Sequence, residues 1–109
     1  MNKVAVIGMV GNSAFLSVDR FHLAGETVAA TGIHFEPGGK GFNQAVAAAR
    51  FGAEVAFLGA VGTECYEEIR GFLLRDGIIP VLPRKDQPTA YAAILTDASR
   101  ILLSSLLIF

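Results

Sequence analysis

The amino-acid sequence predicts one α/β domain with a mostly parallel sheet, flanking helices and a small β insertion. Short apolar runs alternate with helical patterns, and glycines or prolines separate them. A β-α-β alternation indicates parallel strands with helices packed on them. Hydrophobic residues make up 52% of the 109 residues and charged residues 17%. Parallel strands buried on both faces explain this apolar content, and so does apolar surface left for a partner or a missing segment.

The first third of the chain contains one buried strand and a β insertion. Residues Lys3–Ile7 form a continuous β-rich apolar run, which predicts a central parallel strand. Gly11-Asn12 is a turn signal. The mixed pattern of Phe15–Phe21 predicts a half-exposed strand, and the loose alternation of Thr27–Phe35 predicts one or two short strands.

The remaining two thirds alternate helices with strands. Apolar residues at helical spacing predict helices at Phe42–Phe51 and Glu64–Arg75, each followed by a glycine that suits a C-terminal cap. Apolar runs predict strands at Glu54–Val61, Ile78–Leu82 and Ala90–Leu95. No internal repeat or linker interrupts this order.

Composition and charge argue against several kinds of binding partner, including nucleic acid and membrane. The net charge is −1 and the pI is about 6.1, without the basic stripe that binds nucleic acid. The single cysteine, Cys65, allows neither an internal disulfide nor a cysteine-based metal site. The N-terminal run is too short for a signal peptide, and the last nine residues are too few to span a bilayer. We therefore expect a cytoplasmic protein that binds neither nucleic acid nor membrane.

A glycine cluster at the start of the first helix is the main candidate for ligand binding. Gly38, Gly39 and Gly41 allow close backbone approach, and the helix start offers free N–H donors. Lys40 adds a charge and Asn43 a paired donor and acceptor. A tight strand-to-helix turn explains the same glycines equally well. Lys40 fits a solvated turn cation, and Asn43 a helix-start residue that bonds its own backbone.

The spacing of these glycines argues against two common nucleotide loops. A P-loop has Lys after its last glycine, whereas Phe42 follows Gly41 here. A dinucleotide-binding loop has Gly-x-Gly-x-x-Gly directly after the first strand, whereas Gly8-Met9-Val10-Gly11 follows it here.

The segment Gly38–Gly62, "GGKGFNQAVAAARFGAEVAFLGAVG", resembles the N-terminal signature of the ribokinase-like, or PfkB, sugar kinases. The form Gly-Gly-Lys-Gly-x-Asn-Gln-Ala is most similar to the ribokinase branch. The resemblance covers about residues 3–99 and implies the N-terminal half of a ribokinase-like fold. It also implies that residues 19–37 form a β lid, through which a homodimer can form.

The resemblance implies a sugar site in this half of the enzyme. Asp19 would accept hydrogen bonds from sugar hydroxyls, while Gly38, Gly39, Lys40 and Asn43 grip the sugar from the other side. Considered without the family, Asp19 fits an exposed carboxylate at a strand end. A ribose-like sugar is favoured, with hexoses, sugar phosphates and nucleosides as alternatives.

The family's catalytic parts are not found in these residues. The resemblance implies ATP and Mg²⁺ as cofactors of the full-length enzyme, whose base lies in a Gly-Ala-Gly-Asp motif of the C-terminal half. That motif is absent here, so we expect no catalytic, cofactor-binding or metal-binding residue and poor ATP or Mg²⁺ binding. Residues 1–99 would be the substrate-binding portion. The apolar tail at 100–109 is interpreted as the result of a truncation or frameshift, with an ordinary final strand as the alternative.

Three functional hypotheses follow from these observations. The first is a truncated sugar kinase that binds sugar but is inactive alone. The second is a non-catalytic sugar-binding or interaction module. The third is a fragment that does not fold by itself.

Overall fold

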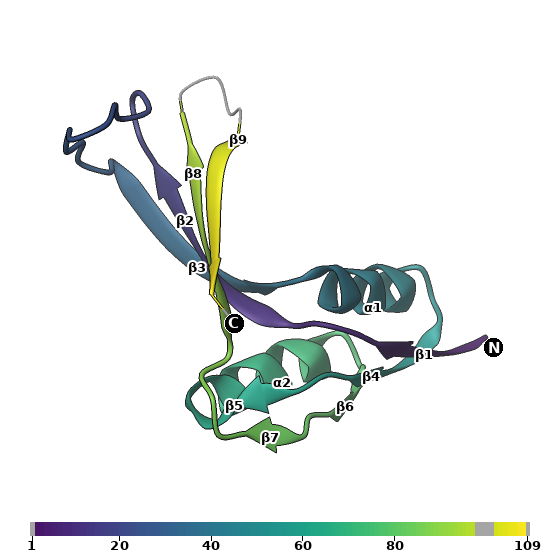
Figure 1. Ribbon diagram of the computed structural model, residues 1–109. Coiled ribbons are helices and arrows are strands. Elements are labelled where there is room, and N and C mark those ends of the chain that lie inside the picture. The colour runs from purple at the N-terminus through teal and green to yellow at the C-terminus, as the bar shows by residue number, and fades with distance from the viewer. Residues whose placement is uncertain (1, 98–101, 109) are drawn as a thin grey trace.

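A computed structural model describes residues 2–97 and 102–108 and divides the strands mainly between two sheets. The first sheet is parallel and has the order β1-β4-β6. Its strands are β1 (Lys3–Ile7), β4 (Glu54–Leu58) and β6 (Ile79–Val81). Figure 1 shows this sheet with the helices beside it, and the second sheet rising away from them.

Two helices pack against the first sheet and form the core with it. Helix α1 (Lys40–Arg50) contributes Phe42 and Ala45, and helix α2 (Tyr66–Arg75) contributes Ile69 and Leu73. A 3₁₀ turn, η1 (Thr63–Cys65), precedes α2. Phe57 of β4 is fully buried, and its ring meets that of Phe42 edge-on at 6.4 Å. Helix α1 lies in the connection from β1 to β4, and α2 lies in the connection from β4 to β6. Both connections run in the same direction across the sheet, and such connections are right-handed, so both helices lie on one face.

The opposite face of the first sheet is apolar and exposed. Its neighbouring positions Ile7, Leu58 and Val81 form one row across the three strands, and Ile79 lies in the next row. Ile7 is 77% exposed, Ile79 55% and Val81 47%. Parallel sheets are usually covered on both faces. We call these four residues the open sheet face.

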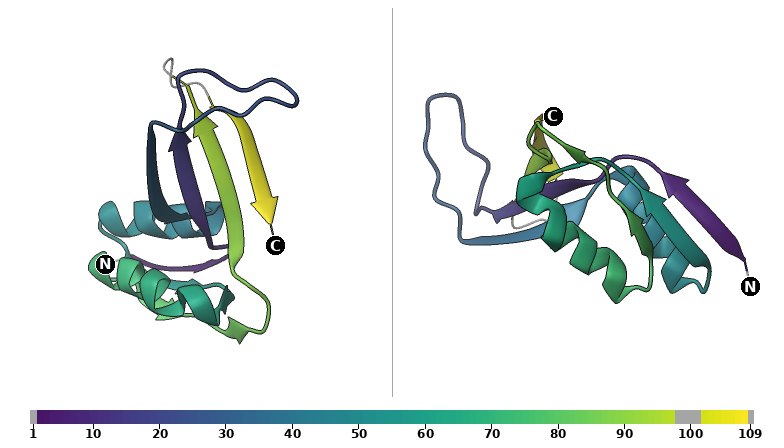
Figure 2. Two further views of the ribbon diagram at one scale, coloured as in Figure 1. Left: turned by 90° about the vertical axis from the view of Figure 1, so that its left-hand side faces the viewer. Right: turned by 90° about the horizontal axis from the view of Figure 1, so that it is seen from below.

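The second sheet has the order β3-β2-β8-β9 and extends away from the helices (Figure 2). The pair β2–β8 is parallel, and the pairs β2–β3 and β8–β9 are antiparallel. The strands are β2 (Gly11–Ser17), β3 (Gly32–Gly38), β8 (Ala90–Thr96) and β9 (Leu102–Ile108).

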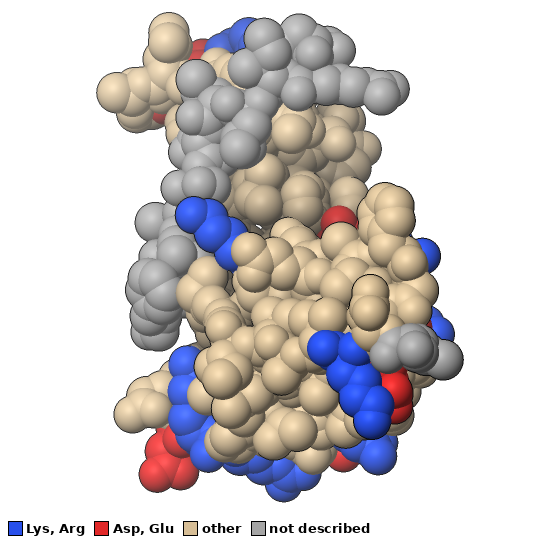
Figure 3. Space-filling model, turned by 90° about the vertical axis from the view of Figure 1, so that its right-hand side faces the viewer, with Lys and Arg blue, Asp and Glu red and all other residues tan. Residues whose placement is uncertain are grey.

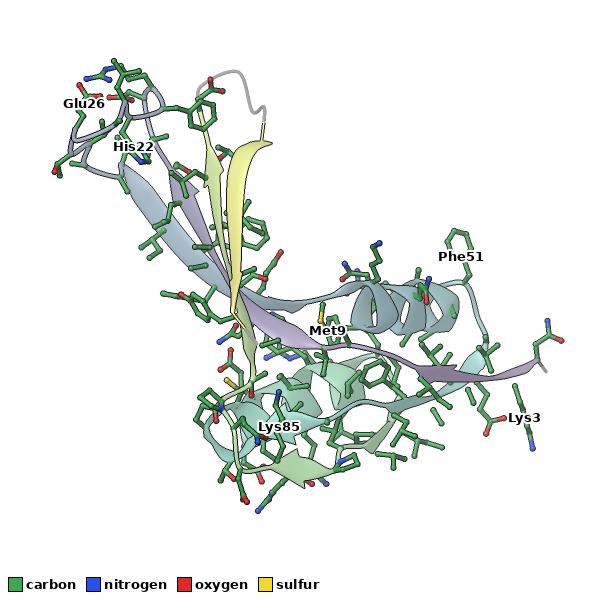
Figure 4. All side chains as sticks on the ribbon, in the orientation of Figure 1. Lys3, Met9, His22, Glu26, Phe51 and Lys85 are labelled. Carbon is green, nitrogen blue, oxygen red and sulfur yellow. The ribbon has the colours of Figure 1, made fainter. Side chains whose placement is uncertain are left out.

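The described chain crosses between the two parts of the fold at three places. Residues 8–10 join β1 to β2, Gly39 joins β3 to α1, and residues 86–89 lead into β8. A short parallel pair, β5 (Val61–Gly62) with β7 (Arg84–Lys85), lies beside the third crossing. Figure 4 shows Met9 of the first crossing at the junction of the two parts.

The structure confirms the α/β class with mostly parallel strand pairs and corrects several element assignments. Gly11-Asn12, expected to be a turn, begins strand β2, because pairing with β3 on one side and β8 on the other fixes its backbone. Residues 18–31 contain no strand, so the insertion is part strand and part loop. The strand expected at Ala90–Leu95 is found at Ala90–Thr96, and it belongs to the second sheet.

Two further findings concern the chain's surface and its last strand. The part of the chain that the structure describes has no helix of the length and hydrophobicity needed to cross a bilayer. Uncharged residues cover most of the face in Figure 3. The backbone of β9 pairs with β8, and the division of the chain at residue 99 stays a prediction.

Candidate functional site

A pocket of about 540 Å³ lies where the second sheet meets the start of α1. Pockets of roughly 300–1,000 Å³ are typical of small-molecule sites. All three crossings contribute to it or adjoin it. The lining residues are Met9, Gly11, Asn12, Ser13, Gly38, Gly39, Lys40, Asn43, Ala90, Ala92 and Ile94.

The glycine turn before α1 forms one wall of the pocket. Gly39 has φ = 108°, a backbone conformation that L side chains rarely adopt. A Cβ on Gly39 would lie 2.7 Å from the carbonyl oxygen of Met9, so only glycine fits this turn without movement. The N–H of Phe42 donates to the same carbonyl oxygen at 3.3 Å. The turn is therefore fixed against the first crossing.

The start of α1 presents unsatisfied backbone donors near the pocket. Gly39 is the N-cap residue, no side chain caps the helix, and its first turn contains no acidic residue. The first N–H groups of a helix have no partner within the helix, and its N-terminus carries a partial positive charge. Lys40 and Asn43 lie in this first turn and line the pocket. Four of the five residues expected to bind sugar are thus brought together: Gly38, Gly39, Lys40 and Asn43.

Asp19, the fifth expected residue, is not brought to this pocket. Gly11 pairs with Gly38 at the pocket end of β2, and Ser17 pairs with Gly32 at the far end. At about 3.3 Å per residue, the seven-residue strand carries the chain about 20 Å away before Asp19. Figure 4 shows His22 and Glu26 of the following loop at the tip of the second sheet, far from Met9. The structure therefore does not bring Asp19 to the glycine turn, because β2 begins at Gly11 and ends before Asp19, and a sugar-binding role for Asp19 stays a prediction.

Ser13 and Asn12 occupy the pocket instead and were missed by the sequence-based interpretation. The Asn12 side-chain oxygen accepts a hydrogen bond from the Ser13 N–H at 3.1 Å, and its amide nitrogen lies 3.9 Å from the Cys65 sulfur. Ser13 is 7% exposed. Their position a few residues after the first strand was the available signal, because ligands of open α/β sheets bind beyond the carboxyl ends of strands.

A hydrogen-bonded group behind the pocket positions the start of β8. The N–H of Gly62 donates to the Thr89 hydroxyl at 2.8 Å, and the N–H of Thr89 donates to the Glu64 carboxylate at 2.5 Å. The Thr89 hydroxyl and its backbone N–H lower the pKa of Glu64 to about 2. Burial raises the pKa of the neighbouring Cys65 thiol. These bonds place Ala90 at the pocket wall.

The described residues do not fit a metal ion. No group of three or more His, Cys, Asp or Glu side chains within them could hold one. The pocket's polar side chains are instead hydroxyl, carboxamide and ammonium groups, which suit hydrogen bonding to an oxygen-rich organic ligand, and apolar side chains from the first crossing and β8 line the rest.

The fold is that of the N-terminal portion of the ribokinase-like carbohydrate kinases. A ribokinase from Cryptococcus neoformans var. grubii, solved with ADP, matches 99% of this chain with a TM-score of 0.87 and 31% identity. A ribokinase from Thermotoga maritima matches the same share with a TM-score of 0.85 and 28% identity. The signature of the pfkB family carbohydrate kinases matches residues 1–105, and the chain belongs to this family.

Sequence relatives agree with the structural neighbours. A ribokinase from Bacillus subtilis (strain 168) is 47% identical over 66 residues, which are 61% of this chain and 22% of the relative. The bifunctional ribokinase/ribose-5-phosphate isomerase A of Fructilactobacillus sanfranciscensis is 38% identical over 104 residues, or 91% of this chain and 19% of that protein. The chain thus spans about a fifth of these curated relatives, and it covers 35% of the Cryptococcus structure.

Proposed function

We propose that this chain is the sugar-binding portion of an ATP- and Mg²⁺-dependent sugar kinase, with a ribose-like sugar as its ligand. The observation that carries the proposal is the junction pocket, in which the glycine turn, Lys40 and Asn43 converge on one space. Gly38 and Gly39 let the backbone approach the sugar, and the Asn43 carboxamide both donates to and accepts from hydroxyls.

In this proposal, phosphoryl transfer needs groups beyond the described residues. Such transfer requires positioned phosphates, neutralised charge and a group that takes the hydroxyl proton. ATP with Mg²⁺ supplies the phosphoryl group in the full-length family. The residues of this chain bind and orient the sugar, so we expect the 109 residues alone to be inactive.

A non-catalytic sugar-binding module is the alternative, and it uses the same pocket. The exposed side chains Ile33 and Phe35 of β3 would support either a homodimer through the second sheet or another interaction. We include the homodimer and a cytoplasmic location in the proposal.

Calorimetry with ribose and a coupled kinase assay test the proposal. Asn43→Ala should weaken ribose binding about tenfold, the loss of one or two hydrogen bonds. Gln44→Ala is the matched control, because Gln44 is the next residue of α1 and does not line the pocket. Equal affinity of both variants would contradict the site. ATP-dependent phosphorylation of ribose by the 109 residues would contradict the expected inactivity.

A further inference from the structure

The junction pocket contains one charged side chain and no carboxylate among its lining residues. Lys40 is the charged residue. The resemblance implied a carboxylate acceptor for sugar hydroxyls, but Asp19 lies beyond the far end of β2. The electrostatic balance of the pocket wall is therefore positive.

Ser13 is almost fully buried, and its hydroxyl faces this pocket without a hydrogen-bond partner among the described residues. Ser13 is more than nine-tenths buried, with 7% of its surface exposed. Its oxygen would lie 3.1 Å from a Cβ on Gly38, so it points across the strand pair toward the glycine turn. Within residues 2–97, no hydrogen bond uses this hydroxyl. No fully buried side-chain polar atom of the described residues lacks a partner, so this hydroxyl is open to the pocket, where a ligand atom can pair with it.

The other polar groups of the pocket are mainly donors. Lys40 has three N–H donors and no acceptor. The uncapped start of α1 adds backbone N–H groups and a partial positive charge, with no acidic side chain in its first turn to offset it. The Asn12 oxygen, an acceptor with two lone pairs, already takes one hydrogen bond from the Ser13 N–H. Asn43 offers both a donor and an acceptor.

We propose that the sugar this pocket takes is an anionic one, a ribose-like sugar that carries a carboxylate or a phosphate. This inference rests on the proposed function and narrows its ligand class. An ionised carboxylate only accepts hydrogen bonds, and a phosphate offers several acceptor oxygens, so either matches Lys40, the Ser13 hydroxyl and the helix start. The remaining sugar hydroxyls pair with Asn43 and the glycine backbone.

Glu36 is a nearby carboxylate that would allow the pocket to bind a neutral sugar instead of an anionic one. It is the register partner of Ser13 on the neighbouring strand β3. Glu36 is exposed and lines a neighbouring hollow of about 190 Å³, which shares Asn43 with the junction pocket. A neutral sugar could be bound if Glu36 turned into the junction pocket and accepted its hydroxyl hydrogens. Glu36→Gln removes that acceptor charge and distinguishes the two explanations.

Calorimetry at low and physiological salt, using ribose, ribonate, ribose 5-phosphate and inorganic phosphate, tests the inference. We expect ribonate or ribose 5-phosphate to bind at least about tenfold more tightly than ribose, as charge-assisted hydrogen bonds are stronger. The tighter of the two identifies the anionic group. Higher salt should reduce this preference. Lys40→Gln should abolish most of it, whereas Lys85→Gln, away from the pocket, should leave it unchanged.

Two Ser13 variants and Glu36→Gln complete the test. Ser13→Ala should weaken binding of the preferred anion, and Ser13→Asp should reverse the preference toward ribose, because it adds a carboxylate to the wall. Thermal melts show whether each variant is folded. If the variants of the buried Ser13 unfold, Lys40→Gln, at an exposed position, still tests whether the pocket prefers an anion. Glu36→Gln should not weaken binding of the anionic sugar.

The outcomes separate this inference from the proposed function. Equal or tighter binding of ribose by the unaltered chain, or loss of ribose binding in Glu36→Gln, overturns the anionic preference and keeps the sugar site. Binding of none of the three sugars overturns both proposals. Binding of inorganic phosphate as tightly as ribose 5-phosphate overturns the inference, because the sugar then contributes nothing.

Discussion

The Glu64 carboxylate accepts a hydrogen bond from the Thr89 N–H at 2.5 Å and thereby connects the 3₁₀ turn before α2 to the start of β8. The Thr89 hydroxyl, which also accepts from Gly62, adds to this stabilisation of the ionised carboxylate. The pair fixes one of the three crossings between the parts of the fold.

This contact predicts acid sensitivity. The folded-state pKa of Glu64 is lowered from 4.5 to about 2, so its contribution is fully present above about pH 4.5. That contribution is lost as pH falls through the folded pKa, because the unfolded state then binds more protons. Melting temperatures between pH 6 and 2 should fall less in Glu64→Gln than in the unaltered chain. Glu67→Gln, in the first turn of α2, is the control, and an identical pH profile for Glu64→Gln would contradict the prediction.

Gly39→Ala should destabilise the fold. The alanine would have to adopt φ = 108° with its Cβ 2.7 Å from the Met9 oxygen, a cost of roughly 1–3 kcal/mol. Denaturant titration measures the change in the free energy of unfolding. Gly71→Ala is the matched control: nothing lies within 4 Å of the added Cβ, and its position inside α2 favours alanine by about 0.5–1 kcal/mol. A Gly39→Ala protein as stable as the unaltered chain would show that the turn can rearrange.

Phe57→Ala should cost about 3–5 kcal/mol of unfolding free energy. Phe57 is 0% exposed and packs against Phe42, so truncation leaves a cavity between β4 and α1. Phe51→Ala is its counterpart on the surface, where the ring is 93% exposed and we expect a change within about 0.5 kcal/mol. Comparable losses in both variants would show that the core is not packed as described.

The open sheet face should bind a hydrophobic dye. Ile7, Ile79 and Val81 are largely exposed and lie in neighbouring rows of one sheet. Such a patch promotes association or dye binding. Ile7→Lys with Ile79→Lys should reduce dye fluorescence and raise solubility with little effect on melting temperature. Leu23→Lys, at an exposed residue of the loop between β2 and β3, should leave the fluorescence unchanged.

Strong hydrophobic periodicity made much of the fold predictable. The strand at Lys3–Ile7 agrees fully, and both helices agree within two residues at each end. The resemblance, which rests on several spaced positions, identified the family and brought four pocket residues to attention.

Strand β2 and the residues it positions were not predictable from local pattern. Its sequence, GNSAFLS, begins with residues that favour turns, and only pairing with β3 and β8 makes it a strand. Strand preference depends strongly on such neighbours. The mistaken bounds of this strand left Ser13 out of the expected site, whereas the choice of Asp19 came from the resemblance. The sheet that such polar residues join decides whether they reach the pocket.

The three crossings beside the pocket also mean that both parts of the fold contribute to its wall. The two parts of the fold meet at this junction, and Met9, Gly39 and Ala90 lie at or beside it. Because the pocket wall is shared between the two parts, a ligand that contacts both would hold them at one angle.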